Sequence, residues 1–127
     1  MILFLFSPLC LGPGQTVAWV RNAWRNSAAR HALPLRMDDG YPCLAHFAFE
    51  GPDAAKRKTL YTQLMLERGF LAGPSIYPTL AHDDETVARY EAAIDEVFGL
   101  IADAVRGGRL DKLLAGPVCH SGFRRLL

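Results

Sequence analysis

The sequence has few of the features that would direct a functional assignment at once. Its 127 residues include only three cysteines, Cys10, Cys43 and Cys119, which are widely spaced and form no CxxC motif. Three isolated cysteines give neither a disulfide framework nor a zinc site. The simplest location for such a chain is a reducing compartment, and we expect a cytoplasmic protein.

The chain also lacks a strong charge of either sign. Fourteen Lys and Arg residues balance 13 Asp and Glu residues, which leaves a formal net charge of +1. Proteins that bind nucleic acids depend largely on positive charge to neutralise phosphates. We therefore expect no nucleic-acid partner, and we interpret the short basic clusters at 56–58 and 124–125 as solvated surface.

Long hydrophobic runs are missing as well. The apolar stretch Ile2–Phe6 is far too short to span a bilayer, and no basic residue precedes it. It has no small-x-small cleavage site, and Pro8 interrupts it early, so a secretory signal is disfavoured. We expect an irregular apolar leader over residues 1–14, one domain over 15–127, and no membrane partner. The leader is either a buried or partner-facing segment or the remnant of a longer gene.

What the chain does have is enough apolar residues for one real core. Half of its residues are hydrophobic, and its length is close to that of a typical single domain. Helical spacing predicts a first helix over residues 16–30 with Thr16 as its cap, and a second that starts after Asp53 and stops at Gly69. A third helix is predicted from Asp83 to Gly107. Its apolar positions are Val87, Tyr90, Ile94, Val97, Phe98, Ile101 and Val105.

The segments between these helices are typical of short strands. Residues 33–39 and 43–50 alternate in polarity around the turn signal Asp39-Gly40, which predicts an antiparallel hairpin. Residues 70–81 contain Gly73-Pro74 and Pro78, which favour short edge strands. The predicted order is α-β-β-α-β-β-α. The fold class is therefore α+β, with a small, mainly antiparallel sheet and helices packed on one face.

No complete catalytic motif is present. His31, His46, His82 and His120 form no HExxH pair, so we expect structural roles for all four and no metal site, with His82 ordering a turn. Cys119 and His120 are adjacent, and adjacent side chains in an extended segment point to opposite sides, which argues against a catalytic dyad. From the residues alone we assign no catalytic group.

Ser75 and Tyr77 are the better candidates for contact with a ligand. They lie on a stretch made rigid by glycine and proline between two elements, where binding residues are often found.

An ordered set of residues resembles a known family. The set comprises Thr59, Gln63, Leu66, Arg68-Gly69, Ala81-His82, the helix from Asp83, and Gly122–Leu126. It is similar to the C-terminal part of class III pyridoxal-phosphate-dependent aminotransferases, and the branch that contains glutamate-1-semialdehyde aminomutase is the most similar. The segment "RHALPLRMDDGYPCLAHFAF" also fits the helix-to-hairpin passage of that family. The resemblance covers roughly residues 16–127.

The resemblance implies a fold-type I small domain, which is normally docked on a large cofactor-binding domain. In that family the large domain supplies the Schiff-base lysine, the aspartate at the cofactor ring and the phosphate-binding loop. Lys56, Lys58 and Lys112 occupy no family lysine motif. The resemblance therefore implies that pyridoxal phosphate (PLP) belongs to the parent family but is not bound by this chain alone, which is expected to be inactive in amino-group transfer.

By position in the family, the resemblance implies three residues near the substrate. Ser75 and Tyr77 would face it, and Arg124 would meet a carboxylate, for which the planar guanidinium is well suited. The implied partner is the large aminotransferase domain.

Two other interpretations remain open at this stage. The chain could be a stand-alone interaction or regulatory module that keeps the fold without catalysis and associates with itself or another protein through its exposed apolar surface. It could also be a small-molecule-binding domain that uses the loop between Ser75 and Tyr77.

Overall fold

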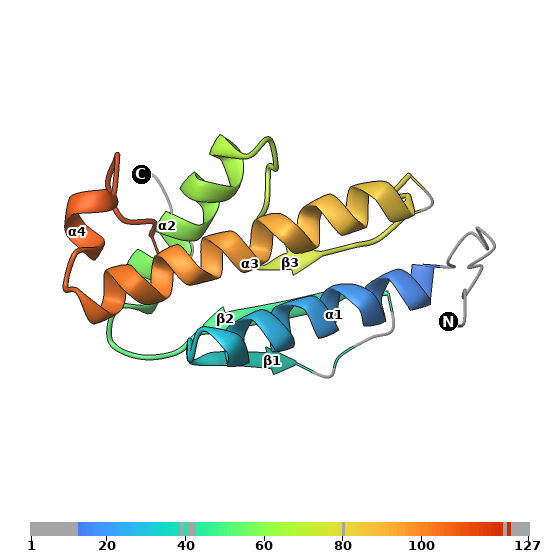
Figure 1. Ribbon diagram of the computed structural model, residues 1–127, viewed down its shortest axis with the longest axis horizontal. Helices are drawn as coiled ribbons and strands as arrows, with labels where there is room; N and C mark the ends of the chain where they lie inside the picture. The colour runs from blue at the N-terminus through green and yellow to red at the C-terminus, as the bar shows by residue number, and fades with distance from the viewer. Residues whose placement is uncertain (1–12, 39, 41–42, 80, 121, 123–127) are drawn as a thin grey trace, which may run out of the picture.

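The computed structural model describes residues 13–38, 40, 43–79, 81–120 and 122. A three-stranded antiparallel sheet with helices packed on it forms this part of the chain (Figure 1). The predicted α+β class is confirmed. None of the helices in these residues has the length and hydropathy that a membrane span needs. The elements are α1 (Pro13–Arg30), β1 (Leu35–Asp38), β2 (Ala45–Phe49), α2 (Ala54–Glu67), β3 (Ser75–Ile76), α3 (Asp84–Arg106) and α4 (Leu110–Leu113).

Helix α1 starts three residues earlier than predicted. Pro13 is a good first residue for a helix because it has no N–H group to leave unpaired. Thr16 therefore lies inside the first turn, where it is 3% exposed, and the prediction that it caps the helix is wrong. The predicted apolar face of this helix is confirmed by the burial of Val17, Val20, Trp24 and Ala28.

The sheet has the order β1-β2-β3. β1 and β2 form the predicted antiparallel hairpin, in which Asp38 pairs with His46 and Leu35 with Phe49. β3 pairs with the other side of β2, with Ser75 opposite His46. Two strands were predicted between residues 70 and 81, but the described residues of that stretch form only β3. Pro74 and Pro78 flank it and cannot donate a ladder hydrogen bond.

Helix α2 begins and ends near the predicted residues, but only its end has the predicted chemistry. The Phe70 N–H donates to the Met65 carbonyl and the Gly69 N–H to the Leu66 carbonyl, each at 2.9 Å. With Gly69 at φ +84°, this is a Schellman ending. At the start, Asp53 occupies the cap position without a side-chain capping bond, because its backbone is not extended (φ −99°, ψ 23°).

Helix α3 has the predicted cap and the predicted core face. The Asp83 carboxylate accepts a hydrogen bond from the Thr86 N–H at 2.7 Å, and this hydrogen bond lowers the pKa of Asp83. The cap works because a carboxylate at a helix N-terminus also meets the positive end of the helix dipole. Of the seven apolar positions predicted for this helix, all are buried except Val105, which is half-buried.

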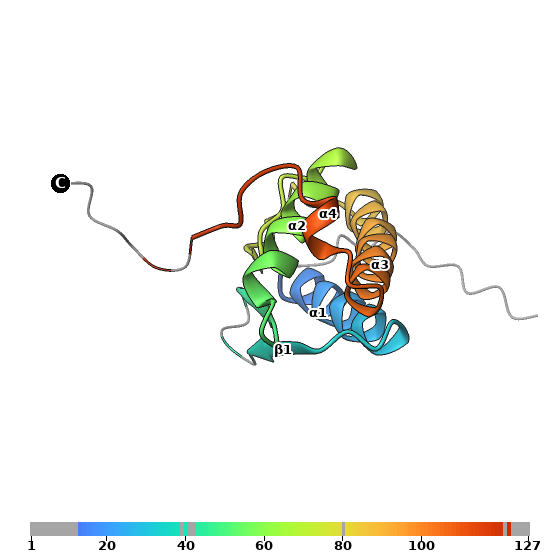
Figure 2. The same cartoon turned by 90° about the vertical axis from the view of Figure 1, so that its left-hand side faces the viewer.

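The core lies between the sheet and the helix layer formed by α1, α2 and α3 (Figures 1 and 2). At its centre the Phe47 ring is 4.8 to 5.8 Å from four other aromatic rings. Those rings belong to Trp24, Phe49, Tyr61 and Phe98. Edge-to-face packing of this kind adds to the stabilisation from burial alone.

A chain of hydrogen bonds crosses the same core. The Trp24 Nε1–H donates to the Tyr90 hydroxyl at 3.0 Å, and the Tyr61 and Tyr90 hydroxyls are 3.2 Å apart. Burial, followed by the proximity of Tyr90, raises the pKa of Tyr61 far above its ordinary value, so its hydroxyl stays protonated. The Tyr61 hydroxyl also reaches the Gly73 carbonyl at 3.4 Å, which ties the segment before β3 to the helices.

Helices α1 and α3 are joined at the surface by a polar cluster on Asp95. Its carboxylate accepts hydrogen bonds from the Ser27 hydroxyl at 3.0 Å, from His31 Nε2 at 3.1 Å and from the Arg30 guanidinium. Partial burial alone would raise the pKa of Asp95, but the bonds from Ser27 and His31 and the charge of Arg30 outweigh it, and the net pKa is lowered.

This lowered pKa gives a first prediction, on the pH dependence of stability. Because the folded form holds the proton less tightly than the unfolded form, Asp95 stabilises the fold above its ordinary pKa of 3.8 and loses that effect as pH falls through its lower folded pKa. We expect Asp95→Asn to lower the urea midpoint at pH 6 and to lower it by much less near pH 3. A midpoint difference that is the same at both pH values would contradict this account.

Candidate functional site

The face of the sheet opposite the helices carries the polar side chains of the strands. Side chains alternate along a strand, so Ala45, Phe47 and Phe49 face the helices and His46 and Ala48 face the other way. We call this second side the open face. The pairing of the strands adds Arg36, Asp38 and Ser75 to it.

Asp38, His46 and Ser75 form a row across the three strands of the open face. The row follows from the register, in which Asp38 lies opposite His46 and His46 opposite Ser75. The His46 Nδ1 atom is 2.8 Å from the Ser75 hydroxyl oxygen, so one hydrogen bond joins the two side chains. This pair is the most clearly defined polar contact on the open face.

A hollow of about 360 Å³ lies next to this pair. It is enclosed by β2, the first turns of α2 and the segment near Cys119, whose N–H donates to the Thr59 hydroxyl at 2.9 Å. Two further side chains able to donate hydrogen bonds, Lys58 and His120, line the hollow together with His46. No Asp or Glu is among the described residues that line it. Its other lining residues, among them Phe47, Phe49 and Ala54, are mainly apolar, so the hollow combines apolar walls with three side chains able to donate hydrogen bonds.

The arrangement does not form a nucleophilic triad. A serine nucleophile needs a histidine base that is itself oriented by a third group. Among the residues that the structure describes, no hydrogen bond or ion pair joins Asp38 to His46, although the two face each other across the strands. The Ser75–His46 pair can therefore bind and orient a polar group, and the described residues place no third group on His46 that would make it a base for acyl transfer.

The three predicted site residues, Ser75, Tyr77 and Arg124, do not come together in one described site. Ser75 lies on the open face and is bonded to His46. Tyr77 follows β3 and is 66% exposed, so it is free to contact a partner or ligand at the sheet edge. Arg124 lies outside the described residues. The sequence thus led to one of the two residues in the polar pair.

Sequence reasoning gave His46 only a structural role. Nothing in its local sequence marks it, because its partner Ser75 is 29 residues away and the two meet only through the β2–β3 register. The role expected for His82 is confirmed: its Nδ1 accepts a hydrogen bond from the Thr79 N–H at 2.9 Å and orders the turn before α3.

Comparison with known proteins gives a likeness of fold. No family model matches the sequence, and no curated protein is similar to it. The fold is similar to part of a solved structure, the PLP internal aldimine form of the FumI protein of Sphingopyxis sp. MTA144. The TM-score is 0.63 with 20% sequence identity, and the match covers 74% of this chain and 23% of FumI. This chain therefore has the fold of a part of a PLP protein and spans less than a quarter of its length.

Proposed function

We propose that this chain, over residues 15–127, is the C-terminal small domain of a class III PLP-dependent aminotransferase or aminomutase, whose reaction is amino-group transfer. Three findings support the proposal: the fold is similar to part of FumI, the ordered residue set resembles that family, and the open face is polar. The glutamate-1-semialdehyde aminomutase branch is the one proposed.

The observation that carries the proposal is the Ser75–His46 pair beside a hollow whose described lining residues include no acidic side chain. The helices cover the opposite face of the sheet, so the open face is left to meet another domain. In the proposed enzyme a large domain docks there and the substrate lies between the two. Ser75 and His46 then orient polar groups of the substrate, with Tyr77 at the sheet edge, and Arg124 is proposed to bind a carboxylate.

The described residues of this chain do not fit a PLP site of their own. Such a site needs an enclosed lysine and an acidic partner for the pyridine nitrogen. The Lys56 ammonium is 2.8 Å from the Asp111 carboxylate, and this hydrogen bond raises the pKa of Lys56, which opposes the neutral amine that Schiff-base formation requires. Lys58 does line the hollow, but no described residue there can serve as the acidic partner.

Because the described residues do not fit a PLP site, a labelling experiment with PLP tests the proposed function. We expect that the purified chain, incubated with PLP and reduced with borohydride, shows no stoichiometrically labelled lysine in peptide mass spectrometry. Lys58 is the most informative position because it lines the hollow, whereas Lys56 does not. Complete labelling of Lys58 would overturn the claim that the chain is inactive alone. The control is Lys58→Arg, which should abolish this labelling and leave any scattered labelling of other lysines unchanged.

A second candidate function is favoured by one observation. Leu71 is 91% exposed and Tyr77 is 66% exposed, on the segment that leads into and out of β3. Exposed apolar side chains beside an edge strand are typical of interaction surfaces. In this alternative the chain is a stand-alone interaction module without catalysis. Sedimentation that shows a concentration-dependent dimer, lost in Leu71→Ser/Tyr77→Ser, would favour it over the small-domain proposal.

A further inference from the structure

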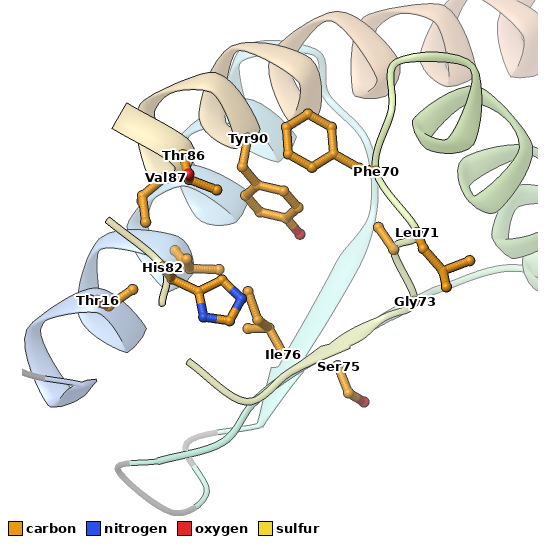
Figure 3. Close-up of a pocket in the computed structure, with 12 residues that line it drawn as sticks. Thr16, Phe70, Leu71, Gly73, Ser75, Ile76, His82, Thr86, Val87 and Tyr90 are labelled. Atoms are coloured by element: carbon orange, nitrogen blue, oxygen red, sulfur yellow. The ribbon is translucent and has the colours of Figure 1, made fainter. Parts of the chain in front are cut away.

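A separate cavity of about 210 Å³ lies on the helix side of β3 (Figure 3). The first turns of α1 and α3 and the segment from Phe70 to Ile76 enclose it. Ser75 contributes to its rim, but in Figure 3 the Ser75 hydroxyl points away from it, and the hydroxyl bonds to His46 on the open face. The cavity is therefore distinct from the polar pair and from the hollow next to it.

The walls of the cavity are mainly apolar. Val20 and Val87 are buried, and Phe70 and Ile76 are half-buried and packed against the core. A dry cavity of roughly 150 Å³ with such walls is large enough for benzene. A ligand the size of one aromatic ring with one substituent therefore fits the volume.

Two polar side chains in the wall have hydrogen-bonding capacity to spare. Thr16 is 3% exposed, and the described part of the chain provides no partner for its hydroxyl. His82 accepts at Nδ1 from the Thr79 N–H, so the neutral ring carries its proton on Nε2. That Nε2–H group also has no partner among the described residues, and the ring lies between Thr16 and Ile76 in Figure 3. The Thr16 hydroxyl oxygen is not one of the fully buried polar atoms that lack a partner, so water can reach it in the empty cavity, and the acceptor of a ligand would take the place of that water.

The charges around the cavity disfavour an anionic ligand. Asp83, Asp84 and Glu85 lie at the start of α3, next to His82. One guanidinium, that of Arg89, lies 5.9 Å from the centre of the Phe70 ring. Among the described residues these carboxylates outnumber the nearby guanidinium and offset the positive end of the α3 dipole, which disfavours a carboxylate or phosphate as the ligand.

From these observations we propose that the cavity binds a small neutral molecule with one ring-sized apolar body and one hydrogen-bond acceptor. The apolar body packs against Val20, Ile76 and Val87. The acceptor receives hydrogen bonds from the Thr16 hydroxyl and from His82 Nε2–H. The site lies on the opposite side of β3 from the face used in the proposed function, and it does not depend on that function.

The test compares benzyl alcohol with toluene, which has a similar shape but no oxygen. In amide-detected NMR titrations we expect saturable shifts with benzyl alcohol, centred on Val20, Ile76 and Val87. Toluene is expected to bind roughly five- to 150-fold more weakly, since each of the two neutral hydrogen bonds contributes about 0.5–1.5 kcal/mol. Shifts that do not saturate, or that centre on other residues, would overturn the proposal. Benzoate that binds as tightly as benzyl alcohol would overturn the preference for a neutral ligand.

Two variants isolate the contribution of each part of the site. Thr16→Val keeps the shape and removes the hydroxyl, so it should bring the affinity for benzyl alcohol towards that for toluene and leave toluene binding unchanged. Val87→Phe fills the cavity and should abolish the binding of both. Leu66→Ala, an exposed position on α2, is the matched control and should bind both as the wild type does. An unchanged ratio of the two affinities in Thr16→Val would contradict the proposed hydrogen bond, whether or not Val87→Phe folds.

Discussion

Replacement of Phe47 by alanine is expected to lower the free energy of unfolding by about 3–5 kcal/mol, the usual cost of removing a buried aromatic ring. Phe47 is fully buried, and its ring lies against four other aromatic rings. The loss therefore combines apolar transfer, the cavity that remains and the edge-to-face contacts. Urea denaturation followed by circular dichroism measures the change.

Two further variants make this result interpretable. Phe47→Leu fills most of the same space and should retain a cooperative transition if the alanine variant does not fold. Leu71→Ala removes an apolar side chain that is 91% exposed, and a surface substitution of this kind should change stability by no more than about 0.5 kcal/mol. Equal losses in Phe47→Ala and Leu71→Ala would show that Phe47 is not at the centre of the core.

The helices were predictable from sequence because their determinants are local. Asp83 as the cap of α3 and Gly69 as the end of α2 are signals that act within one turn, and the structure has both. Thr16 shows the limit of this reasoning. A threonine before an apolar run is typical of a cap, but Pro13 allows the helix to begin earlier, and Thr16 then enters the first turn as a buried residue.

The candidate site was less predictable because its parts meet through strand pairing. Proline and glycine marked the segment around Ser75 as a binding loop, which led to one residue of the pair. His46 and Ser75 are brought together only by the β2–β3 register, and register depends on tertiary packing of the whole sheet. The cavity beneath β3 also depends on tertiary packing and was not predictable from local sequence. Its lining side chains come from α1, α3 and the segment that leads from α2 into β3.

The two sides of β3 have different chemistry because successive side chains of a strand point to opposite faces. With only Ser75 and Ile76 in the strand, one side chain faces the open side and the next faces the cavity. The Tyr61 hydroxyl holds the preceding segment through the Gly73 carbonyl. A change in the packing around Ile76 therefore acts on the same short segment that presents Ser75 to its partner.

Two glycines with positive φ provide the last prediction. Gly51 has φ +104° and Gly69 has φ +84°, so alanine is strained at both. They differ in the space around them: a Cβ at Gly69 has no atom within 4 Å, whereas one at Gly51 meets the Arg57 guanidinium at 3.2 Å. We expect Gly69→Ala to cost about 1 kcal/mol, and Gly51→Ala about 2–4 kcal/mol because crowding adds to strain.

The extra cost at Gly51 depends on Arg57 being held in place. Arg57 is 6% exposed, and its guanidinium donates a hydrogen bond to the Glu50 carbonyl, so it cannot move aside without losing that bond. A double-mutant cycle with Arg57→Ala measures this coupling. In the Arg57→Ala background, Gly51→Ala should cost less than it does in the wild type, because the crowding is removed and only backbone strain remains. If the cost of Gly51→Ala is the same with and without Arg57, the guanidinium does not restrict this position, and the requirement for glycine comes from the backbone alone.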